Sequence, residues 1–243
     1  VNSASIMANC KYIDEVKKYS IKNPNIDLGV HLTVTNEWKN YRWKSLMPAK
    51  ESQTLVNSVG EFPIGIKKFV LKADPTELKK ELQAQINKIK SLGIKPTHID
   101  SHEGALFFNK EHFRVYLEVG EENKLPVFVP RGVDAHFGKG FPKPKNVVVI
   151  KDLYMARKGL KKTKWKEFYL NTIRGLKPGI SQLIVHLSYD DNEMREISID
   201  HPDYGAKWRH LDYEAVTNIS FKKALKQNDI KLVTWKEIQK VLY

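Results

Sequence analysis

The sequence predicts an α/β fold in which seven strands and the helices between them form a single (β/α) barrel. Several segments are nearly continuous runs of β-branched and other apolar residues, which is typical of strands buried on both faces of a parallel sheet. Segments with helical periodicity separate them, and strand–helix–strand repeats imply parallel crossovers. The length of 243 residues suits one barrel domain over 1–243.

The expected strands lie, in chain order, at 3–8, 27–34, 97–100, 126–129, 146–150, 182–187 and 231–235. A barrel of this kind has eight strands. Because the sequence starts abruptly within a strand, we expect the first strand of the barrel to be missing from this chain, in the segment before Val1.

The clearest helix is the segment "DPTELKKELQAQINKIKSLG". Asp74 is suited to cap it, Pro75 to occupy its first position, and Glu77 to complete a capping box, while Gly93 is suited to end it. Its apolar stripe consists of Leu78, Leu82, Ile86, Ile89 and Leu92. Further helices are expected near 12–20, 110–123, 164–174, 211–227 and 235–242.

Residues 35–74 form a long insertion between a strand and its helix. Loops of this length in a compact domain are usually functional, and we expect this one to form a wall of the substrate cleft. Its aromatic residues Trp38, Tyr41, Trp43 and Phe62 could stack on the apolar faces of sugar rings, or they could pack as a small core under the loop. Both interpretations stay open.

Composition limits the class of protein. The net charge of +13 invites a nucleic-acid interpretation, but the lysines are spread along the chain, apart from a dense patch at 157–168, and no nucleic-acid-binding motif accompanies them. Solvated helix faces explain most of this charge, and attraction to an anionic polymer or membrane surface is the alternative. No apolar run approaches the length of a membrane span. The single cysteine excludes internal disulfides and a Cys-rich zinc site. A homodimer is possible, and localisation stays open between cytoplasmic and exported.

Three of the eight histidines fall where expected strands end: His31 in "LGVHLTV", His102 after "THID", and His186 in "LIVHLSYDD". Each alone is more often a core residue than a ligand. In a barrel, however, the carboxyl ends of the strands carry the active site. Two neutral imidazoles and a carboxylate can hold a divalent ion in an open site. The histidines therefore indicate a candidate metal centre.

The stretch "THIDSH" places His98, Asp100 and His102 at alternate positions of a short strand, so their side chains share one face. A polar strand edge with locally satisfied imidazoles would have the same pattern. Taken alone, the stretch favours the polar strand edge.

The segments "NSASIMANC", "DLGVHLTVTNEW", "PTHIDSHEGALF" and "VHLS" resemble the YdjC-like carbohydrate (chitooligosaccharide) deacetylases. The resemblance runs in order along most of the chain. It implies a distorted, TIM-like (β/α) barrel and a metal-dependent hydrolase that removes N-acetyl groups from amino-sugar oligosaccharides.

The resemblance also implies roles for residues. His31 and His102 match the family's metal-binding histidines, and Asp100 is placed to orient His102 or a neighbouring water molecule. His98 is expected to be buried structure. The Asp-Asp pair of the family's first strand, which supplies the third ligand and the general base, has no match in these 243 residues and is expected before Val1.

His186 matches in position the histidine that works at the family's reacting centre. Here it is followed by Leu-Ser rather than the usual Pro-Gly, and His201, which precedes a proline, is its rival. Arg131, after an expected strand, could hold the substrate or fix the base, or it could form a structural salt bridge. Two imidazoles suit Zn²⁺, whereas the resemblance points to Mg²⁺ in some members, so both ions remain candidates.

Two other enzyme and binding functions remain open. The chain could be a metal-dependent hydrolase of a different ester or amide, or a non-catalytic carbohydrate-binding barrel with a degraded site. An Asp-Asp pair upstream would favour catalysis, and another residue type there would favour the binding protein. A nucleic-acid-binding protein would lose affinity steeply with added salt.

Overall fold

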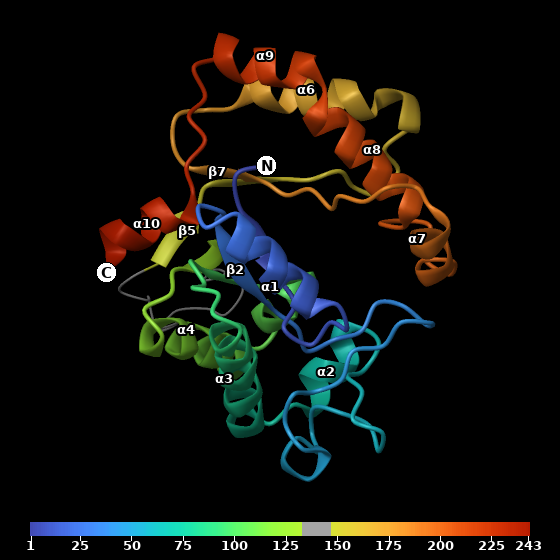
Figure 1. Cartoon of the computed structure of the whole chain (residues 1–243), viewed down its shortest axis with the longest axis vertical. Helices are drawn as coiled ribbons and strands as arrows, with labels where there is room; N and C mark the ends of the chain where they lie inside the picture. The colour runs from blue at the N-terminus through green and yellow to red at the C-terminus, as the bar shows by residue number, and fades with distance from the viewer. Residues whose placement is uncertain (133–146) are drawn as a thin grey trace. The chain divides into compact units, whose positions relative to one another are not determined.

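The computed structural model describes residues 1–132 and 147–243, and these residues form two compact units. The first unit contains the described residues of 1–37, 42–149 and 233–243, and the second contains residues 38–41 and 150–232. Each unit is considered by itself below, and Figure 1 labels the elements of both.

A five-stranded sheet organises the first unit, with its strands side by side in chain order. Its strands are β1 (Ala4–Ile6), β2 (Leu28–Leu32), β3 (Ile99–Ser101), β4 (Val127–Pro130) and β5 (Val147–Ile150). β1 with β2, β2 with β3 and β3 with β4 are parallel pairs, as the strand–helix–strand repeats predict. The register places Ser5 opposite Gly29 and His31 opposite Asp100.

The prediction of a closed barrel is not confirmed. The α/β class and the mostly parallel sheet agree with it, but the sheet formed by the described residues is open. The expected strand at 182–187 is shorter than predicted, and it pairs in a separate two-stranded sheet of the second unit. Periodicity identifies apolar strands but carries no information on which strands pair.

The helical elements of the first unit are α1 (Ile13–Lys22), η1 (Ala49–Glu51), α2 (Ile66–Lys72), α3 (Pro75–Ser91), η2 (His102–Phe107), α4 (Lys110–Glu122) and α10 (Trp235–Leu242). α3 and α4 pack against each other, as Figure 1 shows. Leu82, Ile86 and Ile89 of α3 are fully buried, as are Val30 of β2 and Ile99 of β3. The core of this unit therefore lies between the sheet and α3.

The sequence signals at α3 are confirmed apart from one. The Asp74 carboxylate accepts hydrogen bonds from the backbone N–H groups of Thr76 and Glu77. Gly93 follows the helix with a φ of 81°, a left-handed conformation that glycine adopts at low cost. The capping box does not form, because the Glu77 carboxylate accepts instead from the backbone and hydroxyl of Thr54 in the insertion, at 2.9 and 2.7 Å.

The expected strand at 231–235 is wrong. Residues 231–234 form no strand, and Trp235 begins α10. Thr234 and Glu237 form a reciprocal capping box at that point, and the Asp27 carboxylate accepts the Trp235 backbone N–H at 2.7 Å. This local helix-start signal outweighs the strand preference of the apolar residues before it.

The insertion 35–74 contains η1, α2 and two isolated bridges, which join Asn36 to Ile64 and Lys44 to Glu61. The buried Glu81 carboxylate of α3 fastens it by accepting from Ser45 Oγ at 2.6 Å and from two backbone N–H groups at 3.1 Å. Phe62 and Trp43 are buried, so these two aromatic residues pack in the interior.

The second unit consists of a two-stranded parallel sheet and a helical cluster. Its strands are β6 (Asp152–Tyr154) and β7 (Ser181–Leu183), and its helices are η3 (Lys162–Lys164), α6 (Trp165–Gly175), α7 (Asn192–Ile197), α8 (Ala206–Thr217) and α9 (Ile219–Gln227). Trp165, Tyr169, Trp208 and Phe221 form the centre of its core. In the described parts of both units, no helix is long and apolar enough to span a bilayer.

Candidate metal centre and acid–base residues

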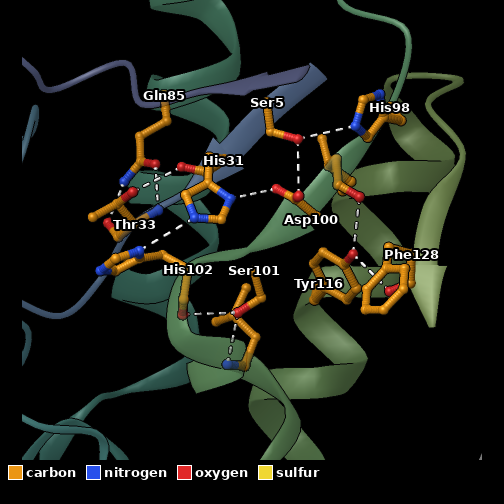
Figure 2. Close-up of polar contacts among 12 residues, drawn as sticks. Ser5, His31, Thr33, Gln85, His98, Asp100, Ser101, His102, Tyr116 and Phe128 are labelled. Carbon is orange, nitrogen blue, oxygen red and sulfur yellow. Dashed lines mark hydrogen bonds and ion pairs between the residues drawn. The ribbon is translucent and has the colours of Figure 1, made fainter. Parts of the chain in front are cut away.

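The first unit brings three of the predicted site residues together at the carboxyl ends of adjacent strands. His31 lies on β2 directly opposite Asp100 on β3, and His102 follows β3. Asp100 Oδ1 is 2.6 Å from His31 Nδ1, and His31 Nε2 is 3.2 Å from His102 Nδ1 (Figure 2). Parallel pairing of the two motifs therefore assembles a carboxylate–imidazole–imidazole line from residues far apart in sequence.

The backbone turns sharply immediately after His102. Glu103 and Gly104 have φ values of 52° and 66°, both in the left-handed region. A left-handed residue other than glycine is uncommon and is often found at functional sites. The Glu103 carboxylate accepts a hydrogen bond from the Thr35 hydroxyl at 2.7 Å, which connects the segments that follow β3 and β2.

Two carboxylates near His102 were not predicted. Glu37 Oε1 lies 3.3 Å from His102 Nε2, and Glu103 Oε2 lies 3.9 Å from the same nitrogen. Both residues are part of the motif segments "TNEW" and "SHEG", but acidic residues in loops carry no signal that they converge. The imidazole of His102 is thus surrounded by acidic groups as well as by His31.

Asp100 carries negative charge in this site. Burial would raise the pKa of its carboxyl group, but the neighbouring His31 and the hydrogen bonds from His31 and Ser5 outweigh burial and hold that pKa below its usual value. An ionised carboxylate bonded to Nδ1 of an imidazole fixes the orientation of that ring. Asp100 therefore orients His31, whereas the sequence analysis placed it beside His102 or a water molecule.

The ring nitrogens of His31 and His102 are spaced as two ligands of one divalent ion would be. Two ring nitrogens bound tetrahedrally to one zinc ion at about 2.0–2.1 Å lie about 3.3 Å apart, and His31 Nε2 and His102 Nδ1 are 3.2 Å apart. No group of three or more His, Cys, Asp or Glu side chains within residues 1–132 and 147–243 is arranged to hold a metal ion. The described residues thus supply an imidazole pair without a complete ligand set.

The predicted substrate residues differ in their surroundings. Trp43 is only 3% exposed, and its ring meets the His102 ring edge-on with centroids 5.3 Å apart. Stacking on a sugar requires an exposed face, so the burial of Trp43 favours its packing alternative, and its contact with a substrate stays a prediction. Arg131 directly follows β4 and is exposed, and its contact with a substrate stays a prediction.

His98 is buried, as predicted. It is 2% exposed, stacks on Trp235 with ring centroids 4.8 Å apart, and has its Nε2 3.0 Å from Ser5 Oγ. Ser5 also donates to Asp100 Oδ2 at 2.8 Å. The buried histidine is therefore connected by one hydroxyl group to the carboxylate that orients His31.

His186 belongs to the second unit and does not end a strand of the five-stranded sheet. β7 stops at Leu183, so the predicted strand end at His186, and the argument from matching registers, are wrong. Its backbone N–H instead donates to Asp212 Oδ2 at 3.1 Å, and its ring meets Tyr204 edge-on with centroids 5.6 Å apart. The proximity of His186 to His31 stays a prediction.

Asp212 holds the segment that carries His186. This fully buried carboxylate accepts from Trp165 Nε1 at 2.8 Å and from the Tyr169 hydroxyl at 2.5 Å, in addition to the His186 backbone. Burial raises the pKa of Asp212 despite these three donors. Asp212 carries no signal in the sequence, because a lone aspartate within a helix gives no sign of distant partners.

The two acidic residues that follow His186 in the chain, Asp190 and Asp191, have partners of their own. Asp190 pairs with Arg195 at 2.7 Å, which lowers the pKa of its carboxyl group, and Asp191 caps α7 through the Met194 backbone. The rival His201 lies in the loop after α7, and its Nδ1 contacts the backbone oxygen of Asp203.

Comparison with known proteins places these features in context. A family model described as YdjC-like protein matches residues 1–227. A carbohydrate deacetylase from Thermus thermophilus is 30% identical over 226 residues, which cover 89% of this chain and 79% of that protein. A carbohydrate deacetylase from Thermoanaerobacter pseudethanolicus is 27% identical over 236 residues, which cover 97% of this chain and 87% of that protein.

A solved structure has a similar fold. A protein from Enterococcus faecalis V583, described as a cellobiose-phosphate cleavage protein, matches with a TM-score of 0.77 at 22% identity. The match covers 98% of this chain and 88% of that protein. At this identity, the likeness establishes a shared α/β fold.

Proposed function

The chain belongs to the YdjC-like family, and we propose that it is a metal-dependent hydrolase that removes N-acetyl groups from amino-sugar oligosaccharides. The relatives named carbohydrate deacetylase support a hydrolase that deacetylates carbohydrates. The observation that carries the metal dependence is the alignment of Asp100, His31 and His102 at the ends of β2 and β3. The N-acetyl group and the oligosaccharide are the finer part of the proposal.

His31 and His102 would hold the ion. Asp100 accepts the Nδ1 hydrogen of His31, so Nε2 of that ring is the nitrogen that remains suited to a ligand role. A bound Zn²⁺ or Mg²⁺ would supply Lewis acidity toward the acetyl carbonyl and a water molecule. The proposal also requires a third ligand and a general base, which the family pattern assigns to an Asp-Asp pair.

His186 would supply the proton that the departing amine needs. An imidazole can carry or release a proton around neutral pH, because the pKa of an unperturbed histidine is about 6.5. The bond from its backbone to Asp212 restrains the position of its main chain, and the edge contact with Tyr204 restrains its ring. Arg131, which is exposed and directly follows β4, would bind the oligosaccharide.

The test uses the full-length protein and N-acetylated chitooligosaccharides, with released acetate as the measure of activity. His31→Ala and His102→Ala should lower the bound divalent metal measured after dialysis. His186→Ala should keep the metal and lose about a hundred- to ten-thousand-fold in turnover, the usual effect of removing a general acid. His201→Ala is the matched control and should retain turnover.

Each variant can contradict its part of the proposal. Undiminished metal content in both His31→Ala and His102→Ala would refute the metal centre. Loss of turnover in His201→Ala, with normal turnover in His186→Ala, would assign the acid to the rival residue. A full-length protein that binds the oligosaccharide but releases no acetate would be a carbohydrate-binding protein instead.

A further inference from the structure

A continuous line of hydrogen bonds connects the buried His98 to His31 through Ser5 and Asp100 (Figure 2). His98 Nε2 is 3.0 Å from Ser5 Oγ, and Ser5 Oγ is 2.8 Å from Asp100 Oδ2. The other carboxylate oxygen of Asp100 is 2.6 Å from His31 Nδ1. The line crosses β1, β3 and β2, so parallel pairing of the strands builds it.

The chemistry of these groups determines which atom donates and which accepts in each hydrogen bond of this line. An ionised carboxylate only accepts hydrogen bonds, so Ser5 donates its single hydroxyl hydrogen to Asp100. The Ser5 oxygen then accepts from His98, which requires a hydrogen on His98 Nε2. On the other side, His31 Nδ1 must carry the hydrogen that Asp100 accepts.

The surroundings of His98 agree with this direction. Burial lowers the pKa of His98, so the ring is neutral and its second nitrogen, Nδ1, is an acceptor. The Thr97 hydroxyl lies 3.0 Å from Nδ1 and can donate to it. The Leu28 carbonyl oxygen lies 3.1 Å from the same hydroxyl and competes for its one hydrogen, but it already accepts the Thr97 backbone N–H at 2.9 Å.

We infer that Ser5 and His98 are positioning residues that hold His31 as its Nδ1–H tautomer, with Nε2 as the acceptor toward His102. The consequence for catalysis rests on the proposed function, because Nε2 is the nitrogen that would bind the ion. Without the donor from Ser5, one oxygen of Asp100 loses its hydrogen bond and the carboxylate is less restrained. Substituting residues that orient ligands in this way typically lowers metal affinity or activity by about 10–100-fold.

Packing holds the His98 ring in the required place. Its face stacks on Trp235 at an interplanar angle of 15°. Gly29, the glycine of the "GVHL" motif, lies so close that an added Cβ would be 2.5 Å from both ring nitrogens. This glycine is therefore required by the position of His98, and the motif's Gly and His serve the same hydrogen-bonded line.

The first test measures which ring nitrogens carry hydrogen, by long-range ¹H–¹⁵N correlation on the metal-free chain with labelled histidine. The signals are assigned with His31→Gln and His98→Gln variants. The expected result is Nδ1–H for His31 and Nε2–H for His98. In Ser5→Ala, His98 Nε2 loses its acceptor, so His98 should shift to its Nδ1–H form. Hydrogen on His98 Nδ1 in the parent, or an unchanged His98 in Ser5→Ala, would overturn the inference.

The second test compares deacetylation by the full-length protein. Ser5→Ala should lower kcat/KM by about 10–100-fold, while Ser5→Thr, which keeps the hydroxyl, should stay within a few-fold of the parent. Ser3→Ala is the matched control, because Ser3 lies two residues earlier and contacts Asp27 rather than Asp100. Ser5→Ala with a kcat/KM within twofold of the parent would refute the positioning role. A parent that releases no acetate contradicts the proposed function, and the tautomers of His31 and His98 then decide this inference alone.

Discussion

Gly29→Ala is the substitution whose effect follows most directly from the structure. A Cβ at this position would lie 2.5 Å from Nδ1 and Nε2 of His98, closer than real Cβ contacts allow. The imidazole would have to move, which would disturb its hydrogen bonds to Ser5 and Thr97. Overpacking costs about 1–3 kcal/mol, and each lost hydrogen bond costs about 0.5–1.5 kcal/mol.

The expected loss in the free energy of unfolding is therefore about 2–6 kcal/mol, measured by urea denaturation. It corresponds to a fall in Tm of roughly 5–20 °C for a protein of this size. Gly175→Ala is the control, because nothing lies within 4 Å of an added Cβ at the exposed end of α6. That variant should be as stable as the parent or up to about 1 kcal/mol more stable.

A double-mutant cycle isolates the contact. In a His98→Ala background the imidazole is gone, so Gly29→Ala should cost much less than it does in the parent. If Gly29→Ala lowers the unfolding free energy by less than about 0.5 kcal/mol in the parent, the packing argument for this glycine is wrong. If Gly29→Ala lowers the unfolding free energy equally in the parent and in His98→Ala, the destabilisation does not come from contact with His98.

Two further predictions concern buried polar groups outside the metal centre. Burial lowers the pKa of His112, although its ring bonds the Ala73 carbonyl at 2.9 Å. The neutral ring therefore stabilises the fold fully above the pKa of about 6.5 that histidine has in the unfolded chain. This stabilisation is lost as pH falls below that value, by at most about 1.4 kcal/mol per pH unit. Between pH 7.5 and 5.5 the parent should lose more unfolding free energy than His112→Gln, and an equal loss would contradict this prediction. Asp212→Asn should lower the unfolding free energy by about 1–3 kcal/mol. The amide NH₂ group of asparagine would face either the His186 backbone N–H or the donors of Trp165 and Tyr169. An unchanged denaturation midpoint would show that this carboxylate is not needed for stability.

Short-range interactions explain what the sequence by itself determined. Asp74 caps α3 through N–H groups two and three residues away, and the apolar stripe of α3 repeats with the helical period, so both features are visible in the letters. The motif residues His31, Asp100 and His102 were identifiable because apolar strands carry few polar residues, and a carboxylate between two histidines at alternate positions is unusual. The capping signal "TWKE" at Thr234 was also present, but an apolar run before it favoured a strand.

Tertiary structure alone decided how these pieces combine. His31 and Asp100 meet although they are 69 residues apart, because β2 and β3 pair in one particular register. No local property of "GVHL" encodes that register. The same applies to Ser5, whose hydroxyl became part of the site only when β1 paired beside β2, and to β7, which joined a separate sheet from the one that His186 was expected to share. Strand pairing depends on the packing of the whole chain, whereas a cap or a helical stripe depends on neighbours within one or two turns.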